Sequence, residues 1–169
     1  MSGDARSPEK RRLPVLQEKP GEPEPPRPAW HWVPLGAFAT FLAWLPLSMA
    51  VEAIVRRVAA SAEAHGDHLK GEGLWMVGGH TVAFFAGATI GGLLVGRLAP
   101  DATRRHPPMG GALAAILGWL IAANQGTPGG ALTWALLLAL MMAIGAGGGA
   151  LGGALGRRWR ARSPADPPA

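Results

Sequence analysis

The sequence predicts an all-α, polytopic membrane protein, a bundle of four transmembrane helices. Apolar residues make up 49% of the chain and gather in four long runs that carry almost no charge. Each run approaches the roughly 20 residues that a helix needs to cross the apolar core of a bilayer. Glycine supplies 25 of the 169 residues. It lies mostly inside the apolar runs, where membrane helices tolerate it better than soluble helices do.

The four predicted spans differ in length, and one of them is short. The third run holds roughly 17 residues, so a re-entrant hairpin is the alternative to a full crossing there. The residues before the first run are polar and rich in proline, which is typical of a disordered tail. The predicted spans are residues 33–51, 74–96, 107–123 and 131–155, within a transmembrane domain of residues 30–160 that lies between disordered tails, 1–29 and 161–169.

Positive charges predict the orientation, because cytoplasmic segments retain Lys and Arg. Of the 16 Lys and Arg residues, 13 lie in the two tails and the second loop. The other three lie in the first loop: Arg56, Arg57 and Lys70. This asymmetry predicts a multi-pass protein with both termini cytoplasmic. The preference for Arg (13) over Lys (3), with abundant Ala, Gly and Pro, is typical of a GC-rich bacterial genome, so we expect a bacterial inner membrane. Tryptophan prefers the headgroup boundary, and five of the seven tryptophans fall at predicted span ends: Trp30, Trp32, Trp75, Trp134 and Trp159.

Small residues recur every four positions in the second, third and fourth spans. Helices in lipid associate by close packing, and such GxxxG-type stripes allow backbones to approach. We therefore expect packing faces, within one bundle or between copies of it. Glycines that provide flexibility for gating are the alternative. The first span lacks such a stripe. The stripes are Ala83, Gly87, Gly91; Ala88, Gly92, Gly96; Gly110, Ala114, Gly118, Ala122; and Gly145, Gly149, Gly153.

Two sequence echoes indicate that the protein contains two duplicated hairpins. The first span begins PLGAFATFLAWL and the third PMGGALAAILGWL, while the second ends GGLLVGR and the fourth GGALGR. Each pair of spans runs in the same direction, which predicts a parallel repeat about an axis along the membrane normal. The alternative is chance similarity in sequence rich in alanine and glycine.

His80 is the one readily ionisable side chain well inside a predicted span. It marks either a proton or ion pathway or, as we favour, a neutral imidazole that bonds to a neighbouring helix or to backbone near Met76. The first loop, EAHGDHLKGE, offers Glu63, His65, Asp67 and His68 as weak candidates for a metal site. Their spacing is not diagnostic, so a solvated loop is the favoured interpretation.

Several functional classes are disfavoured by composition. The chain has no cysteine, which excludes disulfides and thiolate chemistry. No nucleophile elbow, phosphate-binding loop or metalloprotease helix is present, so we expect no enzyme and no cofactor. The formal charge of +5 follows the apolar runs and forms no basic stripe with interleaved aromatics, so no nucleic-acid partner is expected.

From Gly78 through Arg158 the chain resembles small, uncharacterised, glycine-rich four-span bacterial membrane proteins of the YrzE-like kind. The resemblance lies in IGGLLVGRLAP, a short basic loop, HPPMGGALAAILGWL and a glycine-rich last span. It implies a four-helix membrane bundle and carries no activity or functional residues. The long proline-rich amino-terminal segment departs from that pattern.

These observations favour a non-enzymatic protein that contacts the lipid bilayer and acts by association. We expect a homo-oligomer or an accessory subunit of a larger membrane complex. Two alternatives remain open: a channel or transporter for a small solute or ion, and a holin-like protein that permeabilises the membrane.

Overall fold

A computed structural model describes residues 29–66, 71–124, 126 and 130–162. A short 3-10 turn, η1 (Ala29–His31), leads into four α-helices, so the all-α prediction is confirmed. All four helices are long and apolar enough to span a membrane. Both predicted tails lie largely outside the described residues. The helices are α1 (Trp32–Ala64), α2 (Glu72–Leu98), α3 (His106–Asn124) and α4 (Ala131–Arg162).

Each predicted span lies within one helix, and two of the helices, α1 and α4, extend well beyond the predicted limits. The third segment is a single uninterrupted helix of 19 residues, so the re-entrant alternative is wrong. The largest extension is in α1, which has 33 residues. There an ion pair between Glu52 and Arg56, one helical turn apart, supports the helix as it leaves the apolar run.

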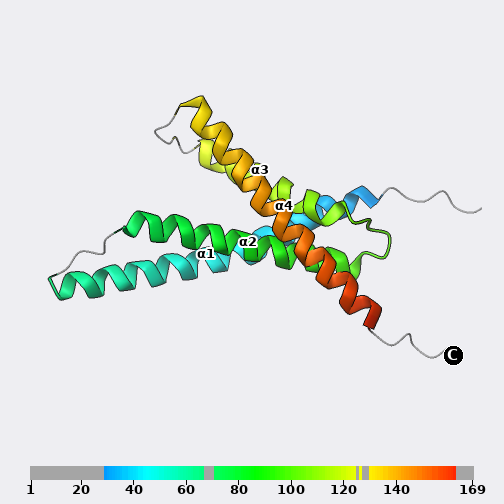
Figure 1. The fold of residues 1–169 in the computed structure, drawn as a ribbon, viewed down its shortest axis with the longest axis horizontal. Helices are drawn as coiled ribbons and strands as arrows, with labels where there is room; N and C mark the ends of the chain where they lie inside the picture. Colours follow the sequence, from blue (N-terminus) through cyan, green and yellow to red (C-terminus); the bar gives the residue numbers. More distant parts are fainter. Residues whose placement is uncertain (1–28, 67–70, 125, 127–129, 163–169) are drawn as a thin grey trace, which may run out of the picture.

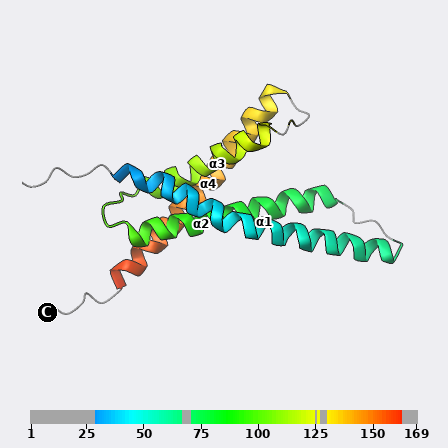
Figure 2. The same cartoon turned by 180° about the vertical axis from the view of Figure 1, so that it is seen from behind.

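The four helices form two antiparallel hairpins, α1–α2 and α3–α4, which cross each other (Figures 1 and 2). At one end, here called the closed end, lie the amino ends of α1 and α3 and the carboxyl ends of α2 and α4. At the opposite end, the open end, the two hairpin tips diverge (Figure 1). The molecule therefore has a crossed half and an open half.

The core is centred on the crossing and is built mostly from small side chains. The buried cluster consists of Ala37, Ala114, Ala115 and one large residue, Phe84. With so little side-chain volume between them, the helix backbones come close together. Contact between backbones therefore replaces the thick layer of large apolar side chains found in a soluble core.

Candidate functional site

The predicted small-residue stripes lie at the crossing, where α2 meets α4. Gly92 packs on Gly149, and a Cβ atom at Gly92 would stand 2.8 Å from the Cα atom of Gly149. One turn further on, a Cβ at Gly96 would stand 2.5 Å from the carbonyl oxygen of Gly153. Cβ atoms do not approach backbone atoms this closely, so only glycine fits these sites.

The same stripe on α4 also faces α3. Gly145 and Gly111 pack on each other reciprocally, each against the carbonyl group of the other. A Cβ at Gly149 would stand 3.0 Å from the carbonyl carbon of Pro107. The stripe Gly145, Gly149, Gly153 therefore lies in the angle between α2 and α3, with no room for a side chain on either side.

The first helix also has a close-packing face, although it lacks a predicted stripe of small residues. Thr40 is 1% exposed, and its hydroxyl donates to the carbonyl oxygen of Gly36 at 2.8 Å. Gly87 and Gly91 pack on this turn of α1, where a Cβ at Gly91 would stand 2.7 Å from the Gly36 carbonyl oxygen. Once its hydroxyl is bonded to its own helix, threonine behaves as a small residue.

Gly118 is the predicted stripe position that does not approach another helix closely. The nearest atom to a Cβ there would be Cζ of Phe41, at 4.0 Å. By contrast, Ala114, one turn earlier on α3, is fully buried. The stripe on α3 therefore makes close contact only in its amino-terminal half.

Sequence reasoning missed a second set of glycines on α4, offset by one position from the predicted stripe. A Cβ at Gly152 would stand 2.7 Å from the Leu93 nitrogen, and one at Gly148 would stand 2.8 Å from the carbonyl oxygen of Phe85. These residues, with Gly156, also recur every four positions. This spacing is visible in the sequence, but it lies directly beside the predicted stripe Gly145, Gly149, Gly153.

A third set of small residues on α4 faces outward. Ala135, Ala139, Ala143 and Gly147 recur every four positions and are all exposed. No atom lies within 4 Å of where a Cβ at Gly147 would be. Unlike the other two stripes on α4, this face is not covered by any described part of the chain.

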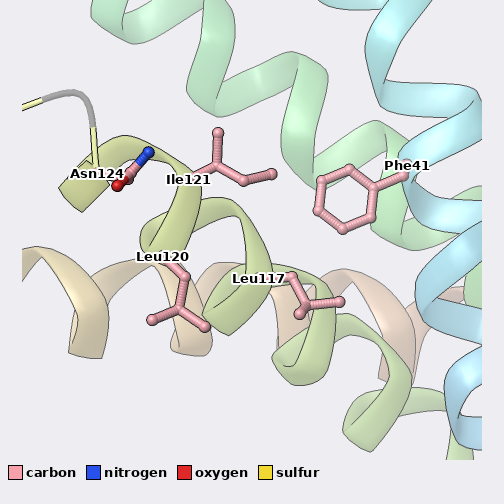
Figure 3. A pocket seen from close by; sticks show the side chains of 5 residues that line it. All are labelled: Phe41, Leu117, Leu120, Ile121 and Asn124. Atoms are coloured by element: carbon pink, nitrogen blue, oxygen red, sulfur yellow. The ribbon is translucent and has the colours of Figure 1, made fainter.

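Two grooves flank the diverging helices of the open half. Figure 3 shows the first, a groove of about 520 Å³ in which Phe41 of α1 faces Leu117 and Ile121 of α3. The second, of about 380 Å³, lies between α2 and α4 and includes Trp44 and His80. The side chains that line both grooves are mostly apolar, which suits contact with acyl chains or with another helix.

His80 is half-buried on α2 and bonds within its own helix. Its Nδ1 lies 2.9 Å from the carbonyl oxygen of Met76, so Nδ1 carries the proton and donates. Thr81 donates to the Val77 carbonyl oxygen at 2.8 Å in the same way. His80 is the only ionisable side chain that the structure places in either groove. A pathway for protons would need further polar groups in sequence along the membrane normal.

The candidate metal residues are only partly within the described structure. Glu63 and His65 are exposed, and His65 Nδ1 lies 2.7 Å from the carbonyl oxygen of Ser61. Asp67 and His68 lie outside the described residues. No group of three or more metal-ligating side chains occurs within the ranges that the structure covers.

No family model, curated protein or solved structure matches this chain.

Proposed function

We propose that this chain is an integral membrane protein that crosses the bilayer four times and acts by association with a second copy of itself through α4. Both termini and the α2–α3 loop face the cytoplasm, on the side of the closed end. The proposal includes no enzymatic activity. The observation that carries it is the outward-facing stripe Ala135, Ala139, Ala143, Gly147.

This stripe supports association because of what drives contact between helices in lipid. Large apolar residues give no advantage there, since lipid tails are equally apolar. Small residues allow two backbones to approach and gain van der Waals contact. The two glycine stripes on α4 are filled by α2 and α3, whereas Ala135, Ala139, Ala143 and Gly147 are all exposed and open to a partner. A symmetric pair would place the same face of α4 on both sides of the contact.

We further propose that the two hairpins are duplicated copies of one unit. The matched segments PLG and PMG place Gly36 and Gly110 at equivalent positions. These two glycines pack on each other: a Cβ at Gly110 would stand 3.3 Å from the Gly36 Cα atom, and the reverse distance is 3.6 Å. Reciprocal contact between equivalent residues supports a two-fold relation between the hairpins.

The orientation can be tested by labelling single cysteines, because the chain has none of its own. We expect Gly126→Cys in the α3–α4 loop to react with a membrane-impermeant maleimide in intact bacterial cells. Ala102→Cys in the α2–α3 loop should react only after permeabilisation. Labelling of Ala102→Cys in intact cells would contradict the four-span orientation.

Association can be tested by oxidative cross-linking in native membranes. We expect single cysteines at Ala143 or Gly147 to form disulfide-linked dimers. Leu42→Cys, on α1, serves as the matched control, since Leu42 is 59% exposed and lies off the proposed face. Gly147→Leu should abolish the Ala143→Cys dimer while the bundle stays folded, because it fills open space. Equal cross-linking of the α1 control and the α4 positions would contradict the proposal. If this face of α4 cross-linked to a different subunit and not to a second copy, the protein would be an accessory subunit of a larger complex.

A further inference from the structure

At the closed end the carboxyl end of α4 passes beside that of α2 (Figure 1), and an arginine of each segment contacts the other segment. The guanidinium carbon of Arg97, on α2, lies 5.9 Å from the ring centre of Trp159, on α4. Arg160 Nη1 donates to the carbonyl oxygen of Ala99 at 2.7 Å, 61 positions away in the sequence. These contacts hold in place two long arginine side chains that would otherwise move freely.

A third arginine, Arg157, lies where Gly153 has no side chain to occupy the space. Arg157 Nη1 lies 3.3 Å from where a Cβ at Gly153 would be. Arg157 therefore folds back along α4 toward the start of α3, where Pro107 packs on the same glycine. Arg157 is half-buried.

Among the described residues of this end, positive charges far outnumber negative ones. Residues 97–106 and 153–162 contain seven arginines and one acidic residue, Asp101. Within the described ranges none of these arginines forms an ion pair, and the pair Glu52–Arg56 lies at the open end. A topology signal requires only that positive charges lie on the cytoplasmic side. It does not require side chains of α2 and α4 to meet as Arg97 and Trp159 do, and this contact gives the positive charge of Arg97 no described acidic partner.

We propose that Arg97, Arg157 and Trp159 form a binding site for the phosphate group of an anionic phospholipid in the inner leaflet. The planar guanidinium fork of arginine matches phosphate oxygens in a bidentate manner. Trp159 is 49% exposed, as suits a ring at headgroup level. Leu98, 60% exposed on the last turn of α2, offers apolar contact for an acyl chain. This apolar surface beside the arginines favours a lipid over a free phosphate ion.

The proposed duplication leads to the same two arginines. Arg97 ends the segment GGLLVGR and Arg157 ends GGALGR, so they occupy equivalent positions in the two hairpins. The site therefore uses one matched cation from each hairpin. It rests on insertion in a membrane but not on self-association through α4, because the closed end and the outward stripe are separate surfaces.

Native mass spectrometry of the full chain in mild detergent can test the proposal by counting bound phosphatidylglycerol across a titration, with phosphatidylcholine as the neutral comparison. We expect saturable binding of phosphatidylglycerol to the unaltered protein. The double variant Arg97→Gln, Arg157→Gln should bind it roughly thirtyfold more weakly, at about 1 kcal/mol for each arginine near a headgroup. The double lysine variant at these positions should retain most of the binding, because it keeps the charges.

Arg104→Gln with Arg105→Gln provides the matched control. It removes two positive charges from the same side of the protein, and the structure shows no contact that ties these residues to the Arg97–Trp159 pair. We expect it to keep phosphatidylglycerol binding nearly unchanged. Equal weakening by both double variants would overturn the proposal in favour of diffuse attraction. Full displacement of the lipid by inorganic phosphate at equal concentration would overturn the choice of a lipid as ligand. Unaltered helical content by circular dichroism separates loss of binding from loss of fold.

Discussion

The crossed half and the open half of this bundle are built from the same four helices, yet they pack in opposite ways. In the crossed half, backbones meet through glycine at Gly92–Gly149 and Gly111–Gly145. In the open half, the hairpins diverge and leave apolar grooves. The difference follows the composition of α4, since residues 131–144 contain no glycine and residues 145–156 contain seven.

This comparison indicates how helices hold together when solvent cannot drive them together. Leucine and methionine in the first half of α4 are as well solvated by lipid as by protein, so they give no reason for close approach. Glycine in the second half gains contact only when another backbone comes near. The crossed half is therefore expected to act as a fixed joint, while the diverging ends are free to adapt to lipid or to a partner.

The largest effect is expected from adding a side chain at the crossing. Gly149→Leu places a side chain against the backbone of Pro107 and Pro108 and forces α4 away from α3. Overpacking of this kind should cost about 3 kcal/mol in free energy of unfolding. Gly147→Leu is the matched control, two residues away on the same helix, where no atom lies within 4 Å. Unfolding in mixed detergent micelles, followed by circular dichroism, measures both.

Similar destabilisation by the two leucine variants would break the comparison. It would mean that leucine weakens α4 wherever it is placed, and not through the contact at Gly149. A destabilised Gly149 variant beside a stable Gly147 variant would assign stability to the crossing.

The sequence was sufficient to predict the helices and the stripes of small residues on them. It was not sufficient to predict which helix each stripe packs against. Periodicity identifies a face of a helix, and α4 has several faces lined by small residues, whose packing partners depend on the crossing geometry. The contact of Gly36 and Thr40 with α2 was not predicted, because a spacing of Gly and Ala does not reveal a threonine that packs closely once its hydroxyl bonds to its own helix. Gly118 was predicted to lie on a packing face, but the stripe on α3 continues past the point where α1 diverges, so Gly118 makes no close contact. Convergence of Arg97 and Trp159 depends on tertiary structure, which spacing alone does not determine.

A smaller effect is expected where the open half has its own interhelical bond. Trp119 Nε1 on α3 donates to the carbonyl oxygen of Trp134 on α4 at 3.0 Å. Trp119→Phe removes this donor and should lower the free energy of unfolding by about 1 kcal/mol. Trp134→Phe is the control, because the acceptor is a backbone atom that the substitution leaves in place. A larger loss from Trp134→Phe would indicate that the ring contact, with centres 5.6 Å apart, matters more than the hydrogen bond.

The smallest effect is expected at His80, the residue that chemistry alone would single out. Its Nδ1 donates to the Met76 carbonyl oxygen in the same helix. This hydrogen bond therefore does not link α2 to another helix. Interhelical hydrogen bonds in a membrane bundle average about 0.6 kcal/mol, and His80→Ala should cost no more than that. The same unfolding measurement checks the stability, and cross-linking through Ala143→Cys checks the assembly. If His80→Ala instead abolished solute or ion flux in proteoliposomes while stability and cross-linking were unchanged, the groove between α2 and α4 would be a conduction path. Association would then be secondary to transport.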